Sequence, residues 1–286
     1  MNVSPAQDGR SESFFLDVAA GRRYCLLHTP AATPHAAVVY LHPFGDEMNK
    51  ARRMAALQAR AFARAGLAVL QIDLHGCGDS SGAFVDARWR QWQDDAVAAM
   101  AHLQERFGVP VCLWGLRLGA LLALDVATTA AGRPAAAPVA GLLLWQPVLN
   151  GATFLTQFLR LRSAGAMLTG EADGGTRVTR GLLAAGSSVE VAGYLLSPAL
   201  AADLDGLDAA ALAPPCPVQW FELGADASRT AGAASVRLAA GWGAATEPTI
   251  VVGPAFWQTQ EIETAPNLLD ASVAALRTIT GAAGHA

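Results

Sequence analysis

Six short apolar runs alternate with stretches of helical period, and this alternation restricts the possible folds more than any other feature of the chain. The runs span 36–42, 67–73, 111–115, 141–145, 218–222 and 249–252. They are continuous and bounded by turn signals, as in strands buried on both faces of a sheet. Helices are predicted at 49–65, 88–107, 118–129, 228–240 and 266–280. The pattern predicts an α/β protein with a mostly parallel, doubly wound sheet and helices on both faces.

Two parts of the chain depart from this alternation. Segments 13–19 and 24–28 predict an opening strand pair that turns at Ala20-Gly21. Segment 150–212 contains glycine-rich turns between short helical pieces. We interpret it as a helical cap inserted over the carboxyl edge of the sheet, where such sheets bind ligands. The 286 residues, of which 52% are hydrophobic, then form one domain, 1–286, that contains this cap.

Composition argues against several classes of protein. The formal net charge is −4 and the basic residues form no run, so a role in nucleic-acid or membrane-surface binding is not indicated. No signal peptide and no apolar stretch of membrane-spanning length is found, which predicts a cytoplasmic protein without membrane insertion. The four cysteines are widely separated and no histidines cluster at ligand spacing, so we expect neither disulfides, nor a metal, nor a cofactor.

The most informative motif surrounds Arg117. Val111 to Ala123 (VCLWGLRLGALLA) is a strand, a turn flanked by Gly115 and Gly119, and an apolar helix that begins with small residues. This context resembles the nucleophile elbow, G-x-S-x-G, of the α/β-hydrolase fold. Arginine stands where the serine is expected. A guanidinium is protonated and only donates hydrogen bonds, so Arg117 cannot attack a carbonyl as serine does.

A literal G-x-S-x-G occurs at Gly78 to Gly82, but its context is wrong. The preceding strand ends near Asp73, and AFVDARWRQW follows instead of a helix of small residues. We therefore reject Ser80 as a nucleophile.

The loop Leu41 to Gly45 (LHPFG) follows the strand at 36–42, where this fold completes its oxyanion hole. Pro43 has no N–H, so Phe44 would supply one donor and Leu118, after the elbow, the other. Together with Arg117 these two residues predict an anion-binding site at the start of a helix.

Four segments together resemble the second type of exosortase-A-system-associated hydrolase, a branch of the α/β-hydrolase superfamily found with bacterial exopolysaccharide and protein-sorting loci. They are Leu41 to Ala63, Gln71 to Gly82 (QIDLHGCGDSSG), Trp114 to Ala123 (WGLRLGALLA) and Gly253 to Glu263 (GPAFWQTQEIE). The resemblance implies an α/β-hydrolase fold, a gene that lies with such exopolysaccharide and protein-sorting loci, and a nominal hydrolase activity on an acyl bond. It does not identify a substrate.

The family order of nucleophile, acid and histidine places the remaining triad positions. Asp226 occupies the acid position, after the strand at 218–222. The histidine position, Gly253 to Trp257, contains no histidine, and the only histidine after His102 is His285, near the C-terminus. We expect Phe256 or Trp257 to fill the vacant volume as an aromatic plug.

Other candidate residues have alternative interpretations. We interpret His42 and His75 as hydrogen-bonded structural residues rather than bases. Cys77 is a substitute nucleophile only if a histidine activates it. Glu47 is an unconventional base or the partner that neutralises Arg117, and the second reading is the more economical because an unpaired buried charge is costly.

Two functions remain open. The first is a hydrolase in which Glu47, Asp226 or a histidine activates water while Arg117 and the oxyanion N–H groups hold the developing charge. The second is a non-catalytic protein that binds an anionic metabolite or a protein partner of the exopolysaccharide pathway. The chemistry of the residues favours the non-catalytic binding protein, whereas the name of the family favours the hydrolase.

Overall fold

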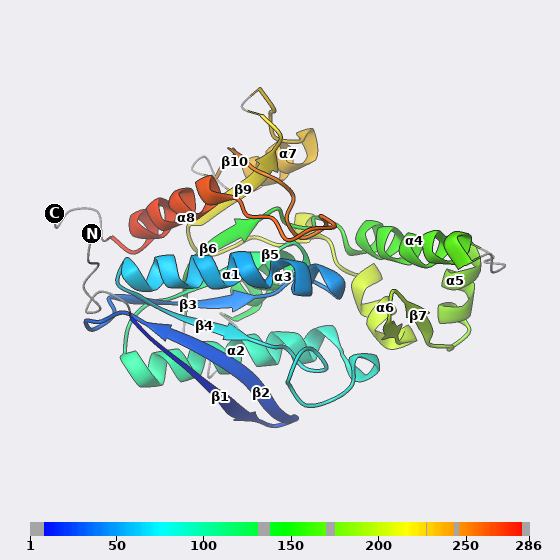
Figure 1. Cartoon of the computed structure of the whole chain (residues 1–286), viewed down its shortest axis with the longest axis horizontal. Coiled ribbons are helices and arrows are strands. Elements are labelled where there is room, and N and C mark those ends of the chain that lie inside the picture. Colours follow the sequence, from blue (N-terminus) through cyan, green and yellow to red (C-terminus); the bar gives the residue numbers. More distant parts are fainter. Residues whose placement is uncertain (1–8, 131–137, 170–174, 227, 243–245, 282–286) are drawn as a thin grey trace.

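The computed structural model describes residues 9–130, 138–169, 175–226, 228–242 and 246–281. Its centre is one eight-stranded sheet with the order β1-β2-β4-β3-β5-β6-β9-β10 (Figure 1). The strands are β1 (Arg10–Val18), β2 (Gly21–Thr29), β3 (Ala36–Leu41), β4 (Leu67–Ile72), β5 (Val111–Leu116), β6 (Val139–Trp145), β9 (Val218–Gly224) and β10 (Pro248–Val252). β2 pairs antiparallel with both β1 and β4, and all pairs from β4 to β10 are parallel. The predicted fold is confirmed.

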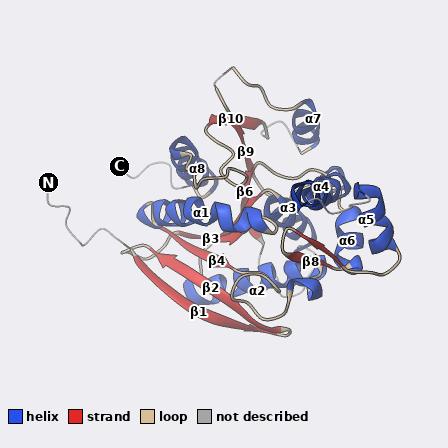
Figure 2. Cartoon of the chain, turned by 45° about the vertical axis from the view of Figure 1, so that its right-hand side comes forward, coloured by secondary structure: helices blue, strands red, loops and turns tan. Residues whose placement is uncertain are grey.

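Helices cover both faces of this sheet (Figures 1 and 2). The helices beside the sheet are α1 (Asp46–Arg64), α2 (Trp89–Phe107), α3 (Leu118–Ala130), α7 (Ala233–Gly241) and α8 (Pro266–Ile279). α1 and α8 pack on one face, where Met54, Phe62 and Leu276 belong to one apolar core. α2 and α3 pack on the other face, in a second core that contains Leu103 and Leu121. Each helix buries one apolar side against the sheet, as expected for this architecture.

Two helices begin several residues away from the position that the sequence predicts. α1 begins at Asp46, not at 49, because Gly45 adopts a φ of 58° and ends the preceding loop. The acidic side chains of Asp46 and Glu47 then occupy the first turn, where the helix dipole favours them. α7 begins at Ala233, not at 228, because Ser228 is held in a turn by the Asp226 carboxylate.

The chain between β6 and β9 forms a separate layer. It comprises α4 (Gly151–Thr169), α5 (Gly175–Ala184), β7 (Val189–Val191), β8 (Tyr194–Leu196), α6 (Pro198–Asp205) and the 3-10 helix η3 (Ala209–Ala211). The two ends of this inserted segment meet, since Asn150 and Asp208 form an antiparallel bridge. In Figure 1 the segment lies beyond the carboxyl ends of the parallel strands, on the right. This is the location predicted for the cap.

One ion pair ties the inserted segment to the main sheet layer. The guanidinium of Arg88, just before α2 and after the 3-10 helix η2 (Phe84–Asp86), donates from Nε and Nη2 to both oxygens of Asp203, at 2.7 and 2.9 Å. The N–H of Trp89 donates to the same carboxylate at 3.1 Å. Because Asp203 lies on α6, these three bonds fix α6 against the start of α2.

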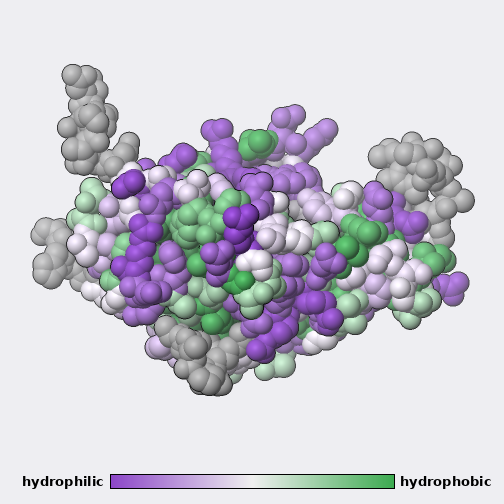
Figure 3. All heavy atoms as spheres, turned by 90° about the horizontal axis from the view of Figure 1, so that it is seen from below, coloured by the Kyte–Doolittle hydropathy of each residue, from purple (hydrophilic) through white to green (hydrophobic). Residues whose placement is uncertain are grey.

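The surface seen from below mixes apolar and polar residues (Figure 3). In the described part of the chain, no helix combines the length and the apolar character needed to cross a membrane.

Candidate functional site

The elbow has the backbone that the sequence predicts. Arg117 lies between β5 and α3 with a φ of 57°, a conformation that is unfavourable for a residue with a side chain. The surrounding backbone holds it there. The N–H of Arg117 donates to Trp145 O at 2.9 Å, and its carbonyl accepts from the N–H groups of Ala120 and Val148, each at 3.1 Å.

The flanking glycines are required by close packing. A Cβ on Gly115 would lie 2.3 Å from Gly119 O, and one on Gly119 would lie 2.2 Å from Leu41 O. Real Cβ contacts are never this short, so neither position accepts a side chain without backbone movement. Gly115 thus allows close contact between the end of β5 and the first turn of α3, and Gly119 allows close contact between α3 and the end of β3. Neither glycine lines the pocket described next.

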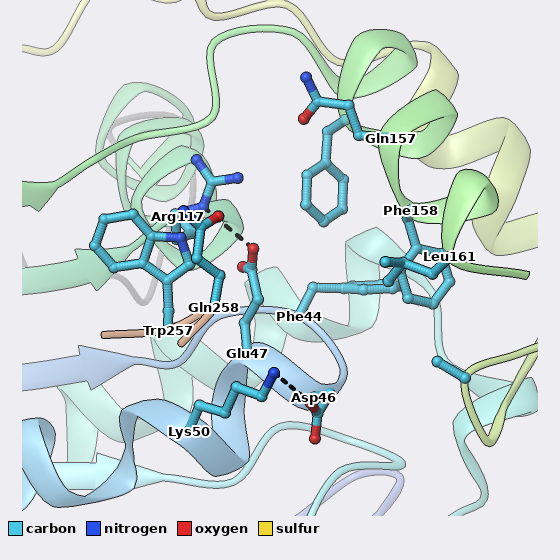
Figure 4. Close-up of a pocket in the computed structure, with 12 residues that line it drawn as sticks. Phe44, Asp46, Glu47, Lys50, Arg117, Gln157, Phe158, Leu161, Trp257 and Gln258 are labelled. Carbon is cyan, nitrogen blue, oxygen red and sulfur yellow. Dashed lines mark hydrogen bonds and ion pairs between the residues drawn. The ribbon is translucent and has the colours of Figure 1, made fainter. Parts of the chain in front are cut away.

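The side chain of Arg117 enters a pocket of about 260 Å³ between the elbow, α1 and α4 (Figure 4). Trp257, Gln258, Glu47 and Lys50 surround its polar end. The other wall is apolar and is formed by Phe44, Phe154, Phe158 and Leu161. The pocket therefore combines a cationic end with an apolar wall.

Glu47 pairs with Arg117, as the more economical reading of the sequence predicted. Arg117 Nε donates to Glu47 Oε1 at 3.3 Å, and the two side chains are 18% and 22% exposed. Burial raises the pKa of Glu47 above its ordinary value, although the Arg117 charge and hydrogen bond lower it. Desolvation is therefore the larger effect on this carboxyl.

The segment after β10 supplies aromatic rings where the fold places its histidine. The Arg117 guanidinium carbon lies 5.6 Å from the centre of the Trp257 ring, a cation–π distance. Phe256 is fully buried behind it and packs edge-on against Trp145 and Trp257. Trp257 thus lines the pocket, whereas Phe256, which we also expected there, belongs to the core. His285 lies outside the described residues.

Asp226 follows β9 at the expected edge of the sheet but does not line the pocket. Its side chain is exposed and accepts bonds from the N–H and hydroxyl of Ser228, at 2.9 and 2.5 Å. These bonds lower its pKa. Asp226 thus occupies the acid position in sequence but does not join Arg117 at the pocket, because this local turn directs the carboxylate to solvent.

His42 and Cys77, two other candidate residues, lie in a small apolar hollow. His42, Pro43, Cys77 and Leu118 line this hollow of about 10 Å³, next to the elbow. The His42 ring is held by Pro43 O at 2.8 Å and by the N–H of Leu74 at 3.2 Å. Burial lowers its pKa. Both ring nitrogens of His42 are therefore engaged by backbone groups.

Cys77 and His75 do not form a reactive pair. Burial, with Asp73 nearby, raises the pKa of Cys77 to about 12, so its thiol is protonated at neutral pH. The His75 side chain is buried, which lowers its pKa, and the backbone N–H of His75 donates to Asp95 Oδ2 at 2.8 Å. Ser80 is likewise structural, because its hydroxyl accepts from Tyr24 N and donates to Asp73 O.

The sequence analysis missed the wall contributed by the inserted segment. Phe154, Gln157, Phe158 and Leu161 of α4 line the pocket, with Ala192 between β7 and β8. The signal was present, since Phe154, Phe158 and Leu161 are spaced at i, i+4 and i+7 on one helix face. Within the described residues, no group of His, Cys, Asp or Glu could hold a metal ion.

Comparisons with known proteins agree with this geometry. A family model described as serine aminopeptidase, S33, matches residues 32–169. Est1E of Butyrivibrio proteoclasticus, solved with ferulic acid, superposes with a TM-score of 0.62 at 16% identity, covering 94% of this chain and 98% of that one. A monoglyceride lipase variant of Saccharomyces cerevisiae gives 0.62 at 14% identity, covering 99% and 98%. Mouse α/β-hydrolase domain-containing protein 10 gives 0.55 at 12%, covering 96% and 100%.

No curated protein matches the chain at a significant level. The strand order, the elbow geometry and these likenesses show that the chain has the α/β-hydrolase fold. Its elbow carries arginine instead of the serine that the G-x-S-x-G motif of this fold provides.

Proposed function

We propose that this chain binds a small organic anion with an apolar arm at the elbow and does not hydrolyse esters by a serine mechanism. The observation that carries the proposal is the direction of the Arg117 side chain, which enters a pocket with one apolar wall. A guanidinium presents paired N–H donors to a carboxylate, and α3 adds the N-terminal N–H groups that have no partner within the helix. Phe154 and Phe158 would contact the apolar arm of the bound anion.

The size of the pocket limits the ligand. A volume of about 260 Å³ is equivalent to roughly nine water molecules. A medium-chain or aryl monocarboxylate of about ten non-hydrogen atoms therefore suits it, and octanoate is a suitable probe.

Calorimetric titration with octanoate tests the proposal. We expect octanoate to bind and to raise the melting temperature, and octanol, which has the same arm without the charge, to do neither. Arg117→Ala should abolish binding. Arg60→Ala is the matched control, because Arg60 is exposed on the distant end of α1 and should bind octanoate as the wild type does. Equal binding of octanol, or full binding by a folded Arg117→Ala protein, would refute the proposal.

A second function is favoured by one observation. Glu47 has a raised pKa and reaches the same pocket, which are properties of a general base. Water activated by Glu47 could attack an acyl bond while Arg117 holds the developing charge. Turnover of 4-nitrophenyl esters or thioesters that is lost in both Glu47→Gln and Arg117→Ala would establish this alternative.

The resemblance of the four segments noted above supports a finer proposal. The chain would act in the cytoplasm beside an exosortase and exopolysaccharide system, with a protein or anionic metabolite of that system as its partner. Deletion of the gene in a producing strain, followed by measurement of exopolysaccharide and of sorted proteins, tests this assignment.

A further inference from the structure

The contact between Arg117 and Glu47 is a single hydrogen bond. It joins Nε to Oε1 at 3.3 Å, whereas a guanidinium that pairs fully with a carboxylate forms two bonds of about 2.7–2.9 Å. Among the described residues, neither terminal nitrogen of Arg117 has a hydrogen-bond partner. Figure 4 shows both terminal nitrogens directed away from Glu47. Arg117 thus retains an edge on which a second carboxylate can bind.

The carboxylate of Glu47 is also incompletely satisfied. Its Oε2 is buried, and no donor reaches it within the described part of the chain. A buried oxygen without a donor disfavours the charged form, and this agrees with the raised pKa of the group. A proton on Oε2 would remove the charge without breaking the bond that Oε1 accepts from Arg117.

Besides Arg117, the charges near Glu47 come from α1 itself. Lys50, one turn away, lines the same pocket and its charge also lowers the pKa of Glu47, while its ammonium pairs with Asp46 at 3.2 Å. From β3, Tyr40 is buried and its pKa is strongly raised by burial, so it stays neutral. From β8, the hydroxyl of Tyr194 accepts from Asn49 at 3.2 Å. The α4 side and the segment after β10 present uncharged pocket residues, and Arg117 is therefore the main cation that stabilises ionised Glu47.

We infer that anion binding at Arg117 is coupled to the uptake of one proton by Glu47. This inference rests on the proposed function. A bound carboxylate would bring a second negative charge next to the guanidinium with which Glu47 is paired. Keeping two neighbouring carboxylates ionised beside one cation costs free energy, so one of them takes up a proton. The proton comes from solvent and adds to the Glu47 carboxylate. No other bond forms or breaks.

The coupling gives a definite pH dependence. Where free Glu47 is ionised and bound Glu47 is neutral, the affinity for octanoate changes by up to tenfold per pH unit and rises as the pH falls. Octanoate itself stays ionised between pH 6 and 8.5, because a simple carboxyl has a pKa near 4–5. The affinity of Glu47→Gln, which cannot take up the proton, should not vary over this range.

Titration calorimetry of octanoate in phosphate and in Tris, whose ionisation enthalpies differ, tests the inference between pH 6 and 8.5. We expect the wild type to take up protons on binding, and Glu47→Gln to take up none and to bind more tightly at pH 8. Glu105→Gln is the matched control, since Glu105 is exposed on α2, does not line the pocket and should leave the uptake unchanged.

The outcomes separate the two proposals. Octanoate binding to the wild type with no proton uptake and no pH dependence overturns the coupling and leaves the proposed function intact. Absence of binding by wild type and Glu47→Gln at every pH overturns both. The uptake is measured on the wild type, so the result does not depend on the folding of a variant.

Discussion

The guanidinium of Arg117 stacks at 5.6 Å over the indole of Trp257, so a cation and an aromatic ring stand where the fold normally places its nucleophile and its histidine. Arg117 lies at the elbow after β5, and Trp257 lies in the segment after β10. In this fold the first position normally carries the nucleophile and the second the histidine. The centre of this hydrolase fold thus holds a guanidinium that contacts an aromatic ring and is paired with Glu47.

The first prediction is that serine alone will not restore hydrolysis. Arg117→Ser recreates G-x-S-x-G at the elbow, but the segment after β10, Gly253 to Trp257, supplies no histidine and Asp226 is exposed. Without a base the hydroxyl stays protonated and weakly nucleophilic. We expect turnover of 4-nitrophenyl acetate by Arg117→Ser to equal that of Arg117→Ala. A clear excess in the serine variant would mean that another group acts as the base.

The second prediction concerns Glu47 and pH. Its pKa is raised in the folded protein, so its contribution to stability is present below the unfolded pKa of about 4.3 and is lost as the pH rises through the folded pKa. Relative to Glu47→Gln, the wild type should lose stability as the pH increases above about 4.3. Melting temperatures of both proteins from pH 4 to pH 8, without ligand, measure the difference. A difference that does not vary with pH would contradict the raised pKa.

The third prediction is that Gly119→Ala destabilises the elbow strongly. The added methyl would lie 2.2 Å from Leu41 O and 2.5 Å from His42 O, both backbone atoms that cannot turn aside. We expect a loss of about 3 kcal/mol or more in the free energy of unfolding. The control is Gly181→Ala in α5, where a methyl meets no atom within 4 Å and should add roughly 0.5–1 kcal/mol through helix propensity. Urea denaturation of both variants provides the values.

The fourth prediction concerns the link between Arg88 and Asp203. The pKa of Asp203 is lowered, first by its hydrogen bond from Arg88, so the stability that it contributes is present above the unfolded pKa of about 3.9 and is lost as the pH falls. Because the Arg88 side chain is half exposed, Arg88→Ala should cost only about 1 kcal/mol at pH 7. Hydrogen exchange should locate the faster opening in α6. Unchanged exchange in α6 would show that other contacts hold the inserted segment.

Much of this architecture follows from local sequence. The buried strands and their helices are set by apolar runs and helical periods, and the elbow is set by Gly115 and Gly119 around Arg117, because these patterns act over a few residues. The absence of a triad histidine from the segment after β10 was equally visible. Glu47 could also be predicted from the sequence as the partner of Arg117, because an arginine in a buried turn requires a carboxylate nearby.

Only the tertiary structure decided which of these residues meet. Asp226 turns to Ser228 through a bond between neighbours, although the strand order brings it to the right edge. Phe256 and Trp257 are adjacent in sequence, yet one enters the core and the other the pocket. The wall formed by α4 depends on how the inserted segment folds back and is fixed by Arg88 and Asp203. The contacts of Arg117 with Trp257 and of Arg88 with Asp203 join residues far apart in the chain, and their geometry depends on packing that no local pattern specifies.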